Sequence, residues 1–224
     1  MPSQRSYHDP CGIARALDRV GERWALLVVR ELLLGPKRFT DLRAGLPGAS
    51  PNVLSQRLRE LETCGAVQRR LLPPPTAVMV YELTPWGREL EPVVLALARW
   101  GSRAVPLPQG ELSVDALMIA LQTTFDPAAS AGLSARLELR LGAERFRVMV
   151  ERGQLEISRG PCQVPDAVVS ADVTRLRAVA FGKRDLARAR RARELGVEGD
   201  LGVAARVLSL FRRPAPASPV APAP

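Results

Sequence analysis

The sequence predicts an α+β protein of two domains, on the strength of three observations. Apolar residues recur at helical spacing over most of the first 105 residues, and at a spacing of two from Leu133 to Val150. Between these regions lies "VPLPQGE", residues 105–111, whose two prolines and one glycine are typical of a domain boundary. We therefore expect a mainly helical domain at 1–105, a linker at 106–112, an α+β domain at 113–213 and a disordered Pro/Ala-rich tail at 214–224.

Composition and charge narrow the classes of function. The 224 residues include 32 basic and 23 acidic side chains, and this net charge of +9 favours a polyanion such as nucleic acid as a partner. The three cysteines are far apart, which argues against a disulfide framework. The chain has a single histidine, the residue most often used in metal sites and as a catalytic base, so both roles are less expected. Nucleophile-elbow, Walker and dinucleotide motifs are absent, so we expect no enzyme, no catalytic residue, no metal and no cofactor.

The amino terminus, "MPSQRSYHDPCG", has no apolar region like that of a signal peptide. No apolar run approaches the roughly 18 residues that a membrane span needs. We therefore expect a cytoplasmic protein with no membrane partner.

The first domain is predicted to run helix, helix, helix, helix, hairpin, helix. Helical periodicity and end signals such as Gly35 before Pro36 mark the helices, and the runs on either side of "PPPTA" have strand composition. The helices are expected at 11–20, 22–35, 39–48, 50–65 and 86–101, and the strands at 66–72 and 78–84. A short helix, a glycine-containing turn, a second helix and a basic hairpin are typical of a winged helix-turn-helix domain, whose second helix reads DNA.

The helix from Ser50 to Gly65 is the expected reading helix. Ser50 suits its cap and Pro51 its first position. At about 100° per residue, one side of it is a leucine stripe made of Leu54, Leu58 and Leu61. The other side carries Asn52, Ser55, Gln56 and Arg59. Alone, this pattern also fits a solvated amphipathic helix, but its place after the turn favours contacts with bases or phosphates, for which these four residue types are suited.

Two long segments carry a family resemblance: "CGIARALDRVGERWALLVVRELLLGPKRFTDLRAGLPGASPNVLSQRLRELETCGAVQRR" and "YELTPWGRELEPVVLALARWG". Together they closely resemble the HxlR family of bacterial winged-helix transcription regulators. The resemblance covers roughly residues 7–104. It implies a homodimer built on the terminal helices, at about Cys11–Val20 and Trp86–Ser102, whose two reading helices enter successive major grooves of double-stranded DNA.

The hairpin departs from the pattern of that family. Many relatives carry an arginine near the hairpin tip, but "PPPTAVM" has none. The hairpin's DNA-binding candidates are therefore Arg69 and Arg70, on the strand before the tip.

Cys11 has two interpretations. It stands at the expected start of the first helix, where the helix dipole favours a thiolate. Some members of the HxlR family resemble this arrangement and use the cysteine as a redox or electrophile sensor. The alternative, which we favour, is a small half-buried residue near the dimer interface. The first interpretation makes Cys11 a candidate redox sensor.

The second domain is predicted from a change of period. A helical stripe runs from Val114 to Phe125, and apolar and charged residues then alternate over Leu133–Leu141, Phe146–Val150 and Leu155–Ile157. "DAVVSAD" supplies a further strand, and helices follow up to "GDLGVAARVLSLFRR". We expect a mostly antiparallel sheet with one buried face. The acids and arginines that alternate in "RLELRLGAERFRV" indicate that its other face is solvated.

The strand order, "PDAVVSADVTRLRAVAFG" and "GVEGDLGVAARVLSLF" resemble the sterol-carrier-protein type 2 fold, which is found as an appended domain in some HxlR-like regulators. The resemblance implies binding of a lipid or another apolar molecule between the sheet and the helices. Periodicity leaves open whether this copy has a cavity for an apolar small-molecule effector or a filled core.

The stretch "GKRDLARARRAREL", residues 182–195, holds six basic and two acidic side chains. It suits an extra phosphate contact or the rim of a site for an anionic ligand. The alternative, which we favour from the sequence, is a solvated helix.

These observations predict a dimeric bacterial transcription regulator that binds a palindromic operator and whose second domain senses an apolar ligand. The alternative from another class is a lipid or apolar-ligand carrier, or an enzyme-like module, that the winged helix only targets to DNA. Salt-dependent operator binding favours the regulator. Ligand transfer or turnover without an effect on DNA favours the alternative.

Overall fold

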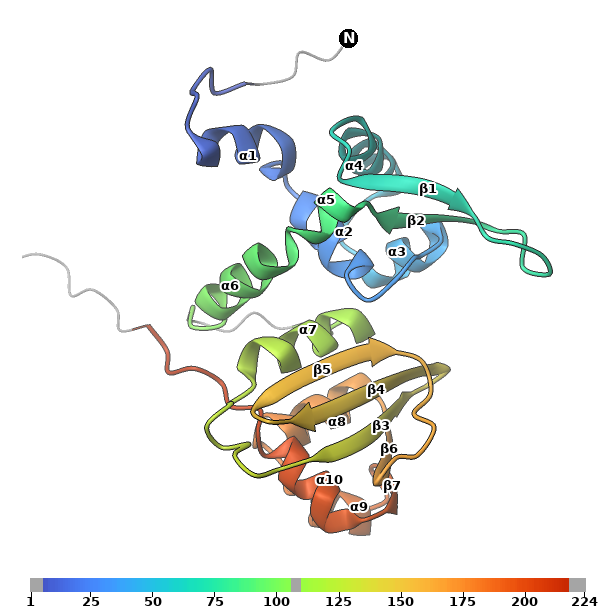
Figure 1. Ribbon diagram of the computed structural model, residues 1–224, viewed down its shortest axis with the longest axis vertical. Coiled ribbons are helices and arrows are strands. Elements are labelled where there is room, and N and C mark those ends of the chain that lie inside the picture. Colours follow the sequence, from blue (N-terminus) through green and yellow to red (C-terminus); the bar gives the residue numbers. More distant parts are fainter. Residues whose placement is uncertain (1–5, 106–109, 218–224) are drawn as a thin grey trace, which may run out of the picture. The chain divides into compact units, whose positions relative to one another are not determined.

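The structure, a computed structural model, describes residues 6–105 and 110–217, and it divides into two compact units, Met1–Val94 and Leu95–Pro224 (Figure 1). The division falls within the helix Glu91–Gly101. Residues 106–109 of the expected linker and 218–224 of the expected tail lie outside the described residues. The bounds of the four segments expected from the sequence stay predictions.

Unit 1 is helical with one two-stranded hairpin. Its elements, in chain order, are α1 (Gly12–Val20), α2 (Ala25–Leu32), α3 (Phe39–Gly45), α4 (Pro51–Thr63), β1 (Val67–Leu71), β2 (Met79–Leu83), α5 (Pro85–Arg88) and the start of α6 (Glu91–Gly101). β1 and β2 pair antiparallel, with Val67 opposite Leu83. A winged helix-turn-helix therefore forms as the sequence predicts.

The core of unit 1 is made by the apolar stripes of its helices. The leucine stripe of α4 is buried, as expected, and α4 packs against α2, β1 and α1. The buried set includes Val28, Leu32, Leu42, Leu54, Leu58, Leu61 and Val80. Burial of this stripe turns the polar side of α4 outward.

The single helix expected over 86–101 is wrong, because α5 ends at Arg88 and α6 begins at Glu91. Pro92 explains the break. It has no N–H to donate to the carbonyl of Arg88, so it suits the first turn of a new helix better than the middle of a long one.

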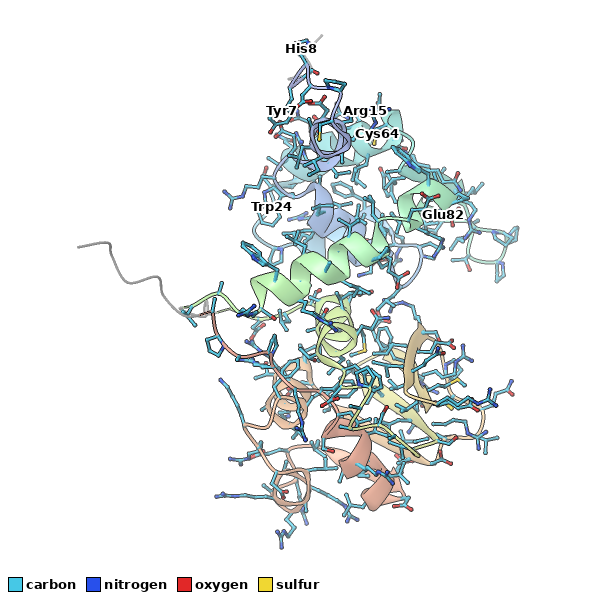
Figure 2. All side chains as sticks on the ribbon, turned by 60° about the vertical axis from the view of Figure 1, so that its left-hand side comes forward. Tyr7, His8, Arg15, Trp24, Cys64 and Glu82 are labelled. Carbon is cyan, nitrogen blue, oxygen red and sulfur yellow. The ribbon has the colours of Figure 1, made fainter. Side chains whose placement is uncertain are left out.

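Trp24 also departs from its predicted helix. It precedes α2 with a φ of 79°, in the left-handed region. A Cβ at Gly48 would lie 2.8 Å from the Trp24 ring, so the turn between α3 and α4 needs a glycine where the indole approaches it. Trp24 is labelled in Figure 2.

Unit 2 is a five-stranded sheet with helices. Its elements after α6 are α7 (Val114–Thr124), β3 (Ala135–Leu141), β4 (Glu144–Glu151), β5 (Gln154–Arg159), β6 (Ala167–Ala171), α8 (Val173–Ala180), α9 (Leu186–Arg191), β7 (Gly196–Gly199) and α10 (Leu201–Leu208). The strand order is β5-β4-β3-β6-β7, and only the β3–β6 pair is parallel within the described sheet. The prediction of a mostly antiparallel sheet is confirmed.

One face of this sheet is apolar and forms part of the core of unit 2. Alternate residues of β3 and β4, such as Leu137, Leu139, Phe146 and Val148, are buried, and α10 packs against β3 and β6. In Figure 1, α8 is drawn behind the strands and α10 beside them. These contacts join the sheet and the last helix in one hydrophobic layer.

The other face of the sheet is not wholly solvated, which differs from the expectation. Glu138 is only 2% exposed. Arg140 Nε donates to one of its carboxylate oxygens at 2.7 Å, and the backbone N–H of Cys162 donates to the other at 2.8 Å. The hydrogen bond from Arg140 lowers the pKa of Glu138, and this outweighs the rise that burial causes. The alternation of charges predicted a solvated face, because it did not reveal the loop around Cys162.

Candidate nucleic-acid interface

The polar side of α4 forms an exposed surface. Ser50 Oγ caps the helix by accepting a hydrogen bond from the N–H of Val53 at 3.3 Å, and Pro51 occupies the first turn. Asn52, Gln56 and Arg59 are exposed, and Ser55 is half-buried. A shallow hollow on this side is lined by Asn52, Gln56, Arg59, Glu60 and Thr63. Three of the four predicted reading residues therefore share one surface, and Ser55 lies at its side.

Glu60 is a member of this surface that the sequence did not single out. Its Oε1 accepts hydrogen bonds from Gln56 Nε2 and from Arg57 Nη2, each at 3.0 Å. Arg57 is buried, so it fixes Glu60, and Glu60 in turn orients Gln56. Spacing by one helical turn was the signal that could have revealed the pair. Arg59 has no ion-pair partner within the part of the chain that the structure describes, and its guanidinium is available to a phosphate or a guanine.

Arg69 and Arg70 lie on the wing strand β1, and both are already ion-paired. Arg69 Nε lies 2.7 Å from Glu62 Oε1 at the end of α4, and its guanidinium is 5.3 Å from the centroid of the Tyr81 ring. The hydrogen bond with Glu62 raises the pKa of Arg69 further. Arg70 Nε donates to Glu82 Oε2 on β2 at 2.9 Å. DNA must compete with these carboxylates for either arginine.

Glu82, labelled in Figure 2, links the two wing strands. It accepts a hydrogen bond from Gln68 Nε2 at 2.9 Å as well as the bond from Arg70. Burial raises the pKa of Glu82, but these hydrogen bonds and the charge of Arg70 outweigh that effect, so its pKa lies below the ordinary value. The wing is thus held by ionised side chains at neutral pH.

A buried carboxylate, Glu31, lies between α2 and the end of α3 in the helix-turn-helix. Glu31 of α2 is fully buried and contacts Arg30 Nη2 at 2.8 Å and Lys37 Nζ at 2.7 Å. A Cβ at Gly45 would lie 2.3 Å from Glu31 Oε2, so the end of α3 packs directly on this group. The ion pair with Lys37 ties α2 to the segment just before α3, and the close approach of Gly45 to Glu31 holds the end of α3 against α2.

Unit 2 has a separate groove at the ends of three helices. It has a volume of about 520 Å³ and is lined by residues of α8, α9 and α10 and their adjoining turns. Its apolar lining includes Val179, Phe181, Leu186, Leu208 and Phe211, and its charged lining is three arginines and one acid: Arg184, which is paired with Glu194, Arg212, Arg213 and Asp185. The guanidinium of Arg213 lies 5.0 Å from the centroid of the Phe181 ring. This size is within the range of small-molecule sites, and the mixture of apolar and basic groups suits an amphipathic anion.

Comparison with known proteins agrees with the geometry of α4 and the wing. Residues 19–108 match the profile of the HxlR-like helix-turn-helix family. The uncharacterized HTH-type transcriptional regulator sll1512 of Synechocystis sp. is 40% identical over 92 residues, which are 41% of this chain and 68% of that protein. The chain belongs to the HxlR family. A second relative, the uncharacterized regulator YvaP of Bacillus subtilis, is 39% identical over 39% of this chain and 82% of its own length.

The match in unit 2 is to a different family. Residues 116–212 match the SCP-2 sterol transfer family, so this HxlR-family chain carries an SCP-2 domain after its winged helix.

Among solved structures, the reduced form of the transcriptional regulator YodB of B. subtilis aligns with 44% of this chain and 98% of its own, at 31% identity and a TM-score of 0.39.

The sensor candidate of this HxlR-family chain, Cys11, is exposed and is the residue before α1. Its backbone N–H donates to Asp9 Oδ1 at 2.8 Å. Cys64 is half-buried at the end of α4, and Cys162 is buried in the loop beside Glu138. Of the three thiols, Cys11 is the one that a small oxidant reaches most easily.

The helices at which the resemblance predicts dimerisation carry exposed apolar side chains. α1 exposes Ile13 by 72% and Leu17 by 42%, and α6 exposes Trp100 by 75%. Trp86 of α5 is also exposed and lines an apolar hollow with Ala16, Val20, Ala66 and Leu90.

Among the described residues, no helix is long and apolar enough to cross a membrane.

Proposed function

We propose that this HxlR-family chain is a homodimeric transcription regulator that acts in the cytoplasm and binds a palindromic operator through α4. The observation that carries the proposal is the outward face of α4, on which Asn52, Gln56 and Arg59 are exposed at the surface of a winged helix-turn-helix. Ser55 joins them as a phosphate or base contact from the first turns of the helix. These residue types, on the outward face of a reading helix, suit contacts in the major groove.

Arg69 and Arg70 complete the proposed contact from the wing. Both lie on β1, the strand that follows α4, and each can replace its glutamate partner with a DNA phosphate. Such an exchange replaces one charged partner with another, so we expect these two residues to contribute less to affinity than Arg59.

A dimer is supported by the exposed apolar side chains of α1, α5 and α6. A side chain such as Trp100 leaves a large apolar area in water, and burial of apolar area drives association. A two-fold dimer places its two reading helices on two half-sites about one helical turn of DNA apart, so its operator is palindromic.

The experiment that tests this proposal is selection of binding sites from a random DNA library by the full chain, followed by affinity measurement on the selected duplex. We expect an inverted repeat whose affinity falls with salt, because phosphate contacts release counterions. Recovery of no common sequence, together with affinity that is equal for selected and random duplexes, would contradict a sequence-specific regulator.

An apolar effector in the SCP-2 domain is the second part of the proposal. The groove lined by Phe181, Leu208 and Phe211 supports it, since its arginine rim suits the carboxylate of a fatty acid. An effector must bind the DNA-competent and DNA-incompetent states with different affinity, because equal binding shifts no population. The competing function is a carrier or enzyme-like module, in which ligand binding leaves operator affinity unchanged.

A thermal-shift screen with fatty acids and hydrophobic aromatics distinguishes these two functions. Ala205→Trp, from an exposed position in the groove, should abolish the shift by filling the space, while Ala129→Trp in a turn outside it should not. Operator affinity is then measured with each hit. Hits that stabilise the chain and leave DNA affinity unchanged would favour the carrier.

Cys11 is proposed as a redox or electrophile sensor on two grounds. Its thiol is exposed, and it precedes α1, whose exposed apolar side chains we assign to dimerisation. Oxidation at this place would alter the surface that sets the spacing of the two reading helices.

A further inference from the structure

Six basic side chains lie between Lys183 and Arg193, in and around the short helix α9. The sequence favoured a solvated helix for this stretch. The structure shows which of its charges are neutralised within the protein and which are not.

The two acidic residues of the stretch are both engaged. Asp185 Oδ1 accepts a hydrogen bond from the backbone N–H of Arg188 at 2.8 Å and so caps α9. Glu194 accepts hydrogen bonds from Arg184, one of them from Nε at 3.0 Å. The remaining basic side chains are exposed and, among the described residues, have no ion pair; they are Lys183, Arg188, Arg190, Arg191 and Arg193.

Single arginines of unit 2 such as Arg145 and Arg206 also lack an ion pair among the described residues, but five others are paired, and the stretch differs in bringing its unpaired charges together. A carboxylate oxygen lies within 4.0 Å of a side-chain nitrogen of each arginine in this set: Arg136, Arg140, Arg152, Arg159 and Arg175. Arg188 and Arg191, by contrast, are spaced by three on one helix, where like charges repel. A cluster of like charges with no internal partner is stabilised by an external polyanion.

We propose that the cluster at residues 183–193 is a second DNA-binding surface, which contacts the phosphate backbone outside the bases that α4 reads. Arginine suits phosphate because its planar guanidinium offers paired N–H donors. The inference rests on the proposed function, since it assumes that the chain is already bound to DNA through α4. A surface on the same chain then meets DNA at a high effective concentration.

Duplex DNA fits this surface better than a membrane does. A helix that lies on a bilayer needs an exposed apolar face to insert among the lipids. The apolar residues of α9, Leu186 and Ala189, are buried in unit 2. The exposed part of the stretch is therefore cationic without an apolar anchor, as in a contact to phosphates alone.

The test is the salt dependence of binding of the full chain to a random-sequence duplex that extends well past one operator length. The variant combines Arg188→Gln, Arg190→Gln and Arg191→Gln, which removes three charges and keeps good helix formers. Its matched control combines Arg136→Gln and Arg145→Gln on the sheet of the same unit with Arg152→Gln in the turn between β4 and β5. A third variant, with lysine at positions 188, 190 and 191, restores the charge.

We expect the slope of log affinity against log salt to fall by about 2 to 3 in the cluster variant, because each lost phosphate contact removes about 0.9. The control variant and the lysine variant should keep the wild-type slope. Thermal unfolding of all four proteins should coincide, which shows that the helix is intact.

Equal slopes for the cluster variant and the wild type would overturn the inference, and so would an equal fall in the control variant. Loss of binding to phosphatidylserine vesicles with no change on DNA would assign the cluster to a membrane instead. The proposed function is tested separately on the selected operator duplex. There Arg59→Ala should lose affinity and the cluster variant should keep its preference for operator over random sequence, so either idea can fail alone.

Discussion

Gln56 donates a hydrogen bond from Nε2 to Oε1 of Glu60, 3.0 Å away and one turn further along α4. Glu60 is held in turn by the buried Arg57. The amide of Gln56 is thus oriented before DNA arrives, which lowers the conformational entropy that a base contact would cost.

The first prediction concerns this reading face. Gln56→Ala and Arg59→Ala should each weaken operator binding by about 1–3 kcal/mol, the range for a good bidentate base contact. The free energy of unfolding should change by about 0.5 kcal/mol or less, because both side chains are exposed. Fluorescence anisotropy and urea unfolding measure the two quantities. Arg88→Ala on α5 is the control for loss of one charge, and unchanged operator affinity in both reading-face variants would remove them from the interface.

The second prediction concerns the dimer. Ile13→Asp or Trp100→Ser should weaken self-association at least about tenfold, since each removes apolar area worth more than about 1.4 kcal/mol from the proposed interface. Sedimentation equilibrium measures the change. Val164→Asp, at an exposed apolar position of unit 2, should have no effect. A chain that is monomeric at all concentrations before mutation would contradict the assignment of these faces.

The third prediction is acid sensitivity of unit 2 through Glu138. The pKa of Glu138 is lowered in the folded state from its ordinary value of about 4.5, chiefly by Arg140, so near that pH the folded state binds fewer protons than the unfolded one. The contribution of Glu138 to the free energy of unfolding is therefore complete above that pH, and it is lost as the pH falls through the lower pKa of the folded state. Urea unfolding as a function of pH should show this loss, and Glu138→Gln should flatten it. Equal pH profiles for the two proteins would show that other carboxylates govern acid unfolding.

Glu138→Ala serves as a stronger variant at neutral pH. It leaves the buried N–H of Cys162 without its acceptor and should cost about 1–3 kcal/mol of unfolding free energy.

The fourth prediction concerns Cys11. Peroxide or a quinone should change the operator affinity of the native protein and leave Cys11→Ser unaffected, because the thiolate is the reactive species. Cys64→Ser and Cys162→Ser are the matched controls and should respond like the native protein. If Cys11→Ser responds as strongly as the native protein does, its role is structural.

The fifth prediction is that residues 113–213 fold alone. Leu137, Leu139, Phe146, Val207 and Phe211 are buried, and they come from the sheet and from the end of the same unit. A fragment of these residues should unfold in one cooperative transition, with calorimetric and van't Hoff enthalpies that agree. A fragment that stays unfolded without residues 95–112 would move the domain boundary toward the division seen within α6.

Local patterns determined most of the elements and which face of α4 is polar and exposed. The cap at Ser50, the proline at Pro51 and the leucine stripe of α4 act within a few residues, so they can be read from the sequence. The same holds for the alternation in β3 and β4, which places one face of the sheet in the core. β7 was missed because "GVEG" is short and glycine-rich, and only its pairing with β6 makes it a strand.

Tertiary structure decided how the charged residues are used. Arg69 and Arg70 look alike in sequence, but Glu62 and Glu82 hold them only because β1 lies beside the end of α4 and opposite β2. The burial of Glu138 depends on a loop more than twenty residues away, and the five unpaired charges around α9 are distinguished by the partners they lack among the described residues. Propensity and periodicity act over one or two turns of chain, whereas an ion pair depends on the distance between groups that the fold alone brings together.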